Sequence, residues 1–284
     1  MASLLSRLAP LVITLRGSKR MFSSATRTLD RVARLQRKPA SFEPPASLGA
    51  TRREVDGWPV FDVGSGDRHV VYLHGGCYVF EIDPVHWTLI GKLAKEAGVH
   101  GVVPIMPLAP VGTAAEVVPA VASLVASLPG QVSIVGDSSG GGMALAVAMA
   151  LRDLEVPPLH ATVLISPWLD VSGTDPRLAE IAPRDPWLAV PGTHAAGALY
   201  RGSLGEADWR VSPLYGSLEG LGPITMFSGT RDILNADAHR LLPLAAEAGV
   251  ALDFHEGEGM IHNYPILPMP EGDAARAVIV AAVR

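Results

Sequence analysis

The sequence predicts an α/β protein in which a mostly parallel sheet is flanked on both faces by helices. Short apolar runs rich in β-branched residues alternate along the chain with longer runs of helix formers. The clearest unit is a strand at 131–135, a turn Gly136-Asp137-Ser138-Ser139-Gly140 and a helix at 141–151. The length of 284 residues suits one large domain with a well-filled core. Strands that alternate with helices pair in parallel and are covered on both faces.

The composition excludes several classes of protein. The chain is 48% hydrophobic and 18% charged, and its net charge of −5 gives no reason to expect a nucleic acid or an anionic membrane as a partner. Its one cysteine, Cys77, excludes an intrachain disulfide and a cysteine-based zinc site, and is compatible with a reducing compartment. No run approaches the roughly 18 apolar residues of a membrane span. We therefore expect a cytoplasmic protein without stable membrane insertion.

The first forty residues differ from the rest of the chain. Their basic side chains are opposed only by Asp30: Arg7, Arg16, Lys19, Arg20, Arg27, Arg31, Arg34, Arg37 and Lys38. Such a segment is typical of a transit peptide, or of an amphipathic helical arm that packs over the main domain. We favour the arm, and expect six apolar side chains to face inward: Leu4, Leu5, Leu8, Leu29, Val32 and Leu35.

The remaining elements follow in order. After a connector at 39–50, strands are expected at 53–62 (a hairpin near a sheet edge), 69–73, 99–106, 160–166, 223–228 and 251–256. Helices are expected at 87–97, 119–128, 236–248 and 273–283, with Pro119 at the first position of its helix. The β/α rhythm breaks between Asp170 and Trp209, which reads as an insertion with a helix at 195–200.

The motif G-x-S-x-G between a strand and a helix is the context of a nucleophile elbow. Gly136 and Gly140 leave room around the tight turn, so that the hydroxyl of Ser138 stands exposed at the carboxyl edge of the sheet. The alternative is an ordinary strand-to-helix turn in which the serine caps the helix.

A serine hydroxyl needs a base within hydrogen-bond reach, and the base needs an orienting acid. Asp232 follows the strand at 223–228, and His262 follows the strand at 251–256, so both are expected at the same sheet edge as Ser138. Asp232 could instead cap the next helix. Asp237 and His255 are rival candidates, but the first falls within a helix and the second within a strand.

The loop after the strand at 69–73 reads His74-Gly75-Gly76-Cys77 and resembles the HGGG-type loop that donates amides to an oxyanion. The amide of Ser139, the residue after the candidate nucleophile, would complete the oxyanion hole. We expect His74 to shape the loop by hydrogen bonding rather than to carry protons.

Together these stretches resemble the hormone-sensitive-lipase branch of the α/β-hydrolases, the bacterial carboxylesterases. The matching stretches lie in the expected order between about residues 70 and 265: Tyr72-Leu73-His74-Gly75-Gly76, Leu108-Ala109-Pro110, Gly136-Asp137-Ser138-Ser139-Gly140-Gly141, Ser166-Pro167-Trp168-Leu169-Asp170, Ser212-Pro213-Leu214-Tyr215, Gly229-Thr230-Arg231-Asp232 and Gly259-Met260-Ile261-His262.

The resemblance implies an α/β-hydrolase fold with a helical cap. The triad would be Ser138, Asp232 and His262, and the oxyanion donors would be the amides of Gly76, Cys77 and Ser139. Residues 1–45 would form a cap arm, and residues 46–284 the catalytic domain with a cap insertion at about 171–209. Four cap residues either line an apolar pocket or belong to the core: Phe22, Trp187, Leu188 and Tyr200.

By the same resemblance we expect a serine carboxylesterase that cleaves small-molecule esters of short to medium acyl chains without a metal or cofactor. A lipase, amidase or deacetylase on the same site remains an alternative, as does a non-catalytic receptor of the same fold, and a homodimer is a compatible assembly. Two departures stand out: Cys77 replaces the third glycine of the loop, and Met106-Pro107-Leu108 replaces a usual Tyr-Arg-Leu. Cys77 should narrow or alter the pocket.

Overall fold

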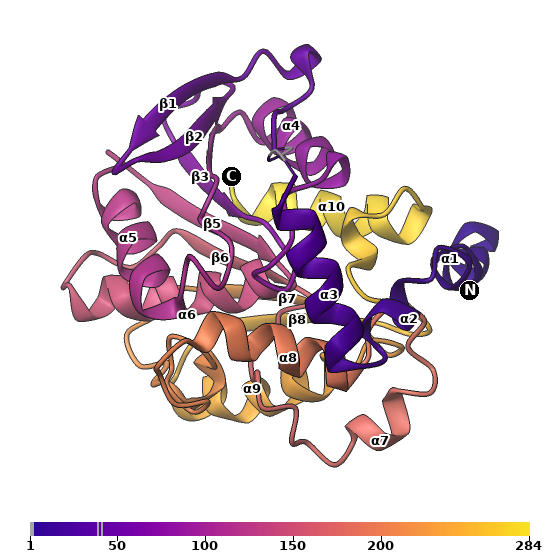
Figure 1. Ribbon diagram of the computed structural model, residues 1–284. Helices are drawn as coiled ribbons and strands as arrows, with labels where there is room; N and C mark the ends of the chain where they lie inside the picture. The colour runs from indigo at the N-terminus through magenta and orange to yellow at the C-terminus, as the bar shows by residue number, and fades with distance from the viewer. Residues whose placement is uncertain (1–2, 39, 41) are drawn as a thin grey trace.

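The computed structural model describes residues 3–38, 40 and 42–284. Residues 1, 2, 39 and 41 lie outside this description; all four belong to the predicted cap arm, 1–45, and the last two also to the predicted connector. An eight-stranded sheet forms the centre of the molecule, and helices cover both of its faces (Figure 1). The predicted fold class is confirmed.

The sheet has the strand order β1-β2-β4-β3-β5-β6-β7-β8. The strands are β1 (Thr51–Val55), β2 (Trp58–Val63), β3 (His69–Leu73), β4 (His100–Pro104), β5 (Val132–Asp137), β6 (Ala161–Ile165), β7 (Ile224–Gly229) and β8 (Leu252–Gly257). The pairs β1–β2 and β2–β4 are antiparallel, as expected for an edge hairpin, and the other five pairs are parallel. The carboxyl ends of β3, β5, β7 and β8 therefore meet at one edge of the sheet.

Ten α-helices are described: α1 (Leu4–Leu15), α2 (Ser18–Phe22), α3 (Ala25–Gln36), α4 (Pro84–Ala97), α5 (Ala114–Ala126), α6 (Ser139–Asp153), α7 (Leu178–Ile181), α8 (Val190–Arg201), α9 (Asn235–Glu247) and α10 (Pro270–Ala282). Two hydrophobic cores lie on the two faces of the sheet. Along β3, Val70 and Tyr72 enter the core that α4 and α10 share, whereas Val71 and Leu73 enter the core of α5, α6 and α9. This alternation is the two-residue period of a strand buried on both faces.

The helix predicted to start at Pro119 begins five residues earlier. Thr113 and Glu116 form a capping box, in which the N–H of Thr113 donates to the Glu116 carboxylate at 3.2 Å. The reciprocal cap stabilises a start at Ala114. Pro119 consequently lies inside α5, where proline is unfavourable. The T-x-x-E spacing was the signal that the sequence prediction overlooked.

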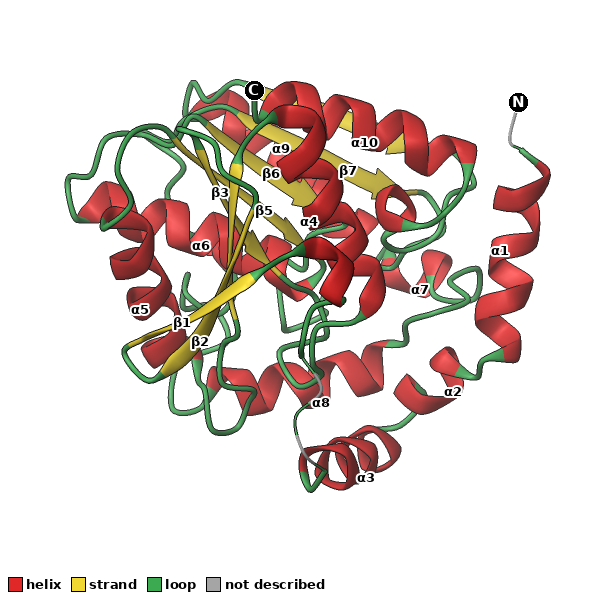
Figure 2. Ribbon diagram, turned by 90° about the horizontal axis from the view of Figure 1, so that it is seen from above, coloured by secondary structure: helices red, strands yellow, loops and turns green. Residues whose placement is uncertain are grey.

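The amino-terminal helices lie along one side of the molecule, and α3 packs on α8 of the insertion (Figure 2). Val32 is buried there and Leu35 is half-buried. The other four predicted inward residues are exposed instead: Leu4, Leu5, Leu8 and Leu29. The prediction was wrong for the first three because α1 packs through a narrow stripe of Ser6, Pro10 and Ile13, and for Leu29 because α3 packs through Thr28 and Val32.

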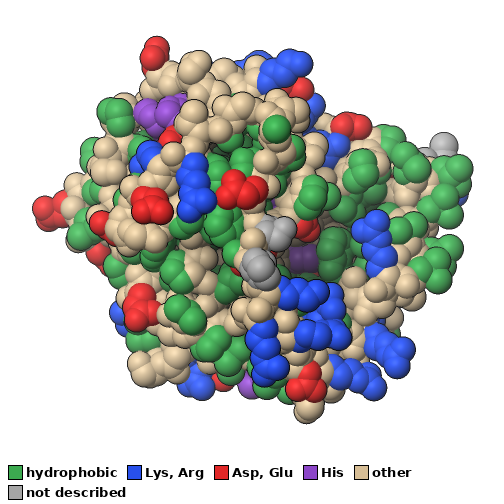
Figure 3. All heavy atoms as spheres, turned by 45° about the horizontal axis from the view of Figure 1, so that its top comes forward, with side chains coloured by type: hydrophobic (Ala, Val, Ile, Leu, Met, Phe, Trp, Pro, Cys, Tyr) green, Lys and Arg blue, Asp and Glu red, His purple; other side chains and the backbone are tan. Residues whose placement is uncertain are grey.

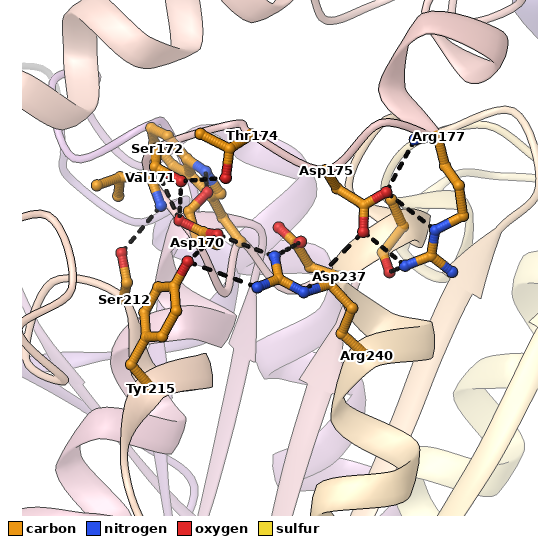
Figure 4. A network of polar contacts seen from close by, with 12 residues as sticks. Asp170, Val171, Ser172, Thr174, Asp175, Arg177, Ser212, Tyr215, Asp237 and Arg240 are labelled. Carbon is orange, nitrogen blue, oxygen red and sulfur yellow. Dashed lines mark hydrogen bonds and ion pairs between the residues drawn. The ribbon is translucent and has the colours of Figure 1, made fainter.

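A polar network holds both ends of the insertion against α9 (Figure 4). Asp170, at its start, accepts from the hydroxyl of Tyr215 at 2.8 Å and from Nη1 of Arg240 at 2.9 Å. Arg240 also pairs with Asp237 at 2.9 Å. Ser212, just past its end, accepts the N–H of Val171 at 3.0 Å. The insertion is thus fixed at its base.

Candidate active site

The turn after β5 places Ser138 at the carboxyl edge of the sheet. Its backbone angles, φ 54° and ψ −120°, are strained for a residue with a side chain. They belong neither to the strand β5 before it nor to the helix α6 after it. The flanking glycines permit this turn, because a Cβ at Gly136 would overlap the backbone of Gly140 and one at Gly140 would overlap that of Leu73. The structure has the strand, turn and helix that the sequence predicts here.

The structure brings together the three side chains predicted from separate loops. His262 Nε2 lies 3.1 Å from the hydroxyl oxygen of Ser138, and His262 Nδ1 lies 2.8 Å from a carboxylate oxygen of Asp232. All three residues are buried, and Asp232 is fully so; the predicted exposure of the Ser138 hydroxyl was wrong, because the hydroxyl faces the buried ring of His262. Burial opposes the charged imidazole, but the neighbouring carboxylate of Asp232 outweighs it, with help from Asp185 and Asp137, and raises the pKa of His262.

The rival residues lie elsewhere. Asp237 is in α9 and pairs with Arg240, and burial raises its pKa to about 7. His255 is in β8, bonds Asp253 and stacks on Phe227. Neither makes a hydrogen bond to Ser138. Asp232 also accepts the N–H of Leu234 at 3.0 Å, so its capping role and its bond to His262 coexist.

Three amides at this site are free to donate. Within the described part of the chain, no group accepts a hydrogen bond from the backbone N–H of Gly76, Cys77 or Ser139. The loop of the first two lies against the start of α6, since the N–H of Tyr78 donates to the hydroxyl of Ser139 at 3.2 Å. Amides of this kind and the positive end of α6 can stabilise an oxyanion beside Ser138.

The backbone of this loop is unusual at Cys77. Gly76, Cys77 and Tyr78 all have positive φ, of 126°, 54° and 65°. Glycine adopts such angles freely, whereas Cys77 keeps them at a steric cost. Its thiol is buried, and burial raises its pKa to about 12, so it stays protonated.

His74 contacts the backbone of its own loop. Its Nδ1 lies 2.7 Å from the carbonyl oxygen of Gly75. Burial, reinforced by the charge of His86, lowers the pKa of His74 to about 4, so the ring is neutral at pH 7. A neutral His74 ring that is hydrogen-bonded to the backbone is better suited to shaping the loop than to transferring protons.

Asp137, the variable residue before the serine, connects the three loops of the site. Its fully buried carboxylate accepts from the N–H of Gly75 at 2.9 Å, from Tyr72 at 2.7 Å and from the side-chain amide of Asn263 at 2.7 Å. Nε2 of His86 lies 3.3 Å away. Burial alone would raise the pKa of Asp137, but His86, the hydroxyl of Tyr72 and the N–H of Gly75 hold it at about 2.

Sequence reasoning missed most of this network. It identified Asp137 only as a member of the serine motif and did not connect it with His86 or Asn263. The one available signal was that Asn263 directly follows His262. Nothing in the spacing of His86 connects it with Asp137, because the two meet only when α4 packs on the sheet.

The insertion adds Asp185, which sequence reasoning did not place, and the predicted cap residue Trp187. Asp185 accepts the N–H groups of Trp187 and Leu188 through one oxygen and that of Ile233 through the other, at 2.7, 2.9 and 2.9 Å. The ring of Trp187 meets that of His262 edge to face, at 5.6 Å between centroids. The insertion therefore covers the imidazole. Of the other predicted cap residues, Phe22, Leu188 and Tyr200 are buried in the core.

A large hollow is lined by the segment that follows the candidate oxyanion loop, Gly75-Gly76-Cys77. A cavity of about 1110 Å³ lies between the amino-terminal helices and the segment Val79–Asp83, which begins two residues after Cys77. The rest of its lining is mixed, with apolar residues such as Met21, Leu35 and Leu108 and several basic side chains of the arm.

Comparison with known proteins agrees with this architecture. Residues 70–266 match a family model described as the alpha/beta hydrolase fold. A triacylglycerol lipase of Mycobacterium tuberculosis is 36% identical over 206 residues, which are 70% of this chain but 43% of that protein, so the chain spans less than half of its length. An acetyl-hydrolase of Streptomyces hygroscopicus is 31% identical over 75% of this chain and 74% of its own.

The solved structures include an esterase from the bacterial hormone-sensitive lipase family. It is 27% identical with a TM-score of 0.78, and the alignment covers 100% of this chain and 99% of that one. The resemblance drawn from the motifs is confirmed. The chain belongs to the α/β-hydrolase fold family, as an esterase/lipase-type hydrolase of its hormone-sensitive-lipase branch.

Proposed function

We propose that the protein is a serine carboxylesterase that works through an acyl-enzyme. The observation that carries the proposal is the continuous hydrogen-bonded chain from Asp232 through His262 to the hydroxyl of Ser138. In this proposal His262 takes the proton of Ser138 as its oxygen attacks the ester carbonyl, and then gives that proton to the departing alcohol. A water molecule, activated by the same imidazole, releases the acid.

The amides of Gly76, Cys77 and Ser139 would receive the negative oxygen of the tetrahedral intermediate. Their lack of another acceptor in the described chain supports this assignment. Such preorganised donors are each worth about 10²–10³ in kcat. Asp232 would hold the imidazole in the tautomer with its proton on Nδ1. The mechanism needs neither a metal nor a cofactor.

The proposed substrates are small-molecule esters with short to medium acyl chains. The apolar ring of Trp187 beside His262 supports an uncharged acyl group near the triad. A homodimer is compatible with this reaction, and a nucleic acid has no part in it.

A graded panel of p-nitrophenyl esters, from acetate to palmitate, tests the proposal. We expect turnover that is highest for chains of two to eight carbons, and a loss of at least about 10³-fold in kcat for Ser138→Ala. Circular dichroism of the variant controls for folding. Equal turnover by the two proteins, or none by the wild type, would favour the receptor. Greater activity on p-nitroacetanilide or on emulsified triglyceride would favour the amidase or the lipase.

We also propose that the protein works in the cytoplasm. The single cysteine is compatible with a reducing compartment. None of the helices in the described residues is long and apolar enough to cross a bilayer. Cell fractionation with activity assays of each fraction would test the location, and recovery from the medium would contradict it.

A further inference from the structure

The outward face of α1 is apolar and exposed. Of ten large hydrophobic side chains that are exposed in the described residues, six belong to this one helix: Leu4 (73% exposed), Leu5 (54%), Leu8 (45%), Leu11 (56%), Val12 (47%) and Leu15 (78%). An exposed apolar patch of this kind, on a protein that buries its other hydrophobic residues well, usually marks an interaction surface.

The opposite face of α1 attaches the helix to the body. The side chain of Ser3 donates to the carboxylate of Glu271 at 2.8 Å, and that of Ser6 does so at 3.0 Å. Pro10 and Ile13 continue this buried stripe. The helix is therefore anchored with its leucines outward, so their exposure follows from its orientation.

The charge of the chain is divided between two regions. Residues 3–38, which hold the three helices of the arm, have nine Lys and Arg residues and one Asp, a net charge of +8, while the rest of the chain carries −13. No carboxylate in the described residues lies within 4 Å of any of the nine basic groups. The overall charge of −5, which gave no reason to expect an anionic membrane, conceals this cationic surface.

The basic and apolar groups lie on one face. Figure 3 shows hydrophobic side chains along the edge of the molecule at α1 and Lys and Arg side chains gathered next to them, around a hollow. Six of these basic residues line the cavity beside the oxyanion loop: Arg16, Arg20, Arg27, Arg31, Arg34 and Lys38.

We propose that this arm face, formed by the exposed residues of α1 and the basic residues of α2 and α3, docks on an anionic phospholipid bilayer. A helix with an apolar face flanked by basic residues lies in the plane of the membrane interface. Basic side chains beside it are attracted to anionic headgroups within about one Debye length. At twelve residues, or roughly 18 Å, α1 is too short to span the apolar core of about 30 Å.

The charge of the arm favours a bilayer over a second copy of the chain. Two arms that met through their leucines would bring two surfaces of +8 together, and their repulsion would oppose the contact. An anionic bilayer offers the opposite charge and an apolar interior in the same layer. Docking would also turn the mouth of the cavity toward the lipid, where apolar esters are concentrated.

Sedimentation with vesicles tests this proposal. The full chain is mixed with vesicles of phosphatidylcholine alone, or with 30% phosphatidylglycerol, in 0.05 M and 0.5 M NaCl. We expect binding to the anionic vesicles at low salt, at least tenfold weaker binding to neutral vesicles, and a marked loss at high salt. The variant Leu8→Ser/Leu11→Ser/Leu15→Ser, and separately Arg27→Gln/Arg31→Gln/Arg34→Gln, should each reduce binding at least tenfold.

Two control variants lie outside the arm. Leu154→Ser removes an equally exposed leucine, and Lys92→Gln/Lys95→Gln removes charges of α4; both should bind as the wild type does. Turnover of p-nitrophenyl acetate by the triple serine variant should be unchanged. Ser138→Ala should bind vesicles as the wild type does. These two controls separate membrane binding from catalysis. Absent binding, or equal binding by the arm variants, overturns the proposal. A dimer in sedimentation that the serine variant dissociates, without vesicle binding, would show that a second copy covers the face.

Discussion

The carboxylates of Asp185 and Asp232 belong to one buried acidic pair, linked through the backbone of Ile233. Asp185 accepts the N–H of Ile233, the residue after Asp232, at 2.9 Å, and Asp232 in turn bonds His262. Burial first, and then the charge of Asp232, raise the pKa of Asp185 to about 6. The insertion thereby contributes a carboxylate to the surroundings of the imidazole.

Asp185→Asn should move the acidic limb of kcat/KM to lower pH, because the charge of Asp185 is one of the groups that raise the pKa of His262. The new amide also leaves the N–H of Ile233 without an acceptor, at a cost of about 1–3 kcal/mol in the free energy of unfolding. The pH profile with p-nitrophenyl acetate and urea unfolding measure the two effects. Asp208→Asn, in the same insertion but paired with Arg210, should leave the limb in place.

The stability of the Asn variant should also depend less on pH. An acid whose pKa rises on folding, here from 3.8 to about 6, stabilises the native state most at low pH. That contribution is lost as the pH rises through about 6. The wild type should therefore lose more stability than Asp185→Asn between pH 4.5 and 7, and equal slopes would contradict the placement of this carboxylate.

The raised pKa of His262 predicts an acidic limb above 6.5, its ordinary value. The imidazole must be neutral to accept the serine proton, so activity should be lost as the pH falls through this raised pKa. Asp232→Asn removes the chief group that raises it, and should shift the limb downward and reduce kcat by about 10⁴-fold. Steady-state kinetics between pH 5 and 9 measure both. A limb that stays in place in Asp232→Asn would contradict the ion pair.

Asp137→Asn should destabilise the protein by about 3–5 kcal/mol, because it removes a buried charge paired with His86 and turns an amide donor toward that of Asn263. Urea unfolding measures the loss. The double variant Asp137→Asn/Asn263→Asp restores one donor and one acceptor and should recover part of it. Asp153→Asn, at an exposed carboxylate, is the control. No recovery in the double variant would contradict a direct bond between the two positions.

Arg240→Met should also destabilise the protein, by up to about 3–5 kcal/mol, because it leaves the buried carboxylates of Asp170 and Asp237 without their guanidinium. Arg210→Met removes a more peripheral pair with Asp208 and should cost about 0–1 kcal/mol. Limited proteolysis should cut the first variant within residues 171–209. Equal unfolding midpoints for the two variants would show that the network does not hold the insertion.

Cys77→Gly should broaden the range of esters that the protein turns over. The glycine removes a side chain from the oxyanion loop and adopts φ 54° without steric cost. The measurement is kcat/KM across the graded ester panel, with Cys77→Ala as the control that keeps a Cβ. An unchanged profile in both variants would show that this side chain does not shape the pocket.

The sequence was most informative about residues that directly follow a strand of the parallel sheet. The strand β3 was predicted at the residues where it occurs, and Ser138, Asp232 and His262 were expected at one sheet edge because each follows a parallel strand. Such reasoning works because strand direction fixes where a loop emerges. Strand direction predicts that a residue lies at a given edge of the sheet. The distances between side chains at that edge follow only from the structure.

The remainder depended on packing between elements that are distant in sequence. Val32 was correctly placed inward, but Leu4 and Leu8 were not, since helical periodicity identifies an apolar face without saying whether it meets protein or another medium. His86 and Asp185 reach the site through α4 and the insertion, and their spacing from Ser138 carries no signal. Polar networks of this kind are set by tertiary contacts.

The single carboxylate of Asp137 has a consequence for how the protein meets its ligands. This carboxylate accepts hydrogen bonds from the backbone of Gly75 and from the side chain of Asn263. It therefore sets the spacing between the two loops that flank Ser138. The reacting centre is thus assembled before any ligand arrives, with little reorganisation left to occur on binding. Structures with and without a covalent inhibitor should superimpose here, and adaptation to different ligands should be confined to the arm and the insertion.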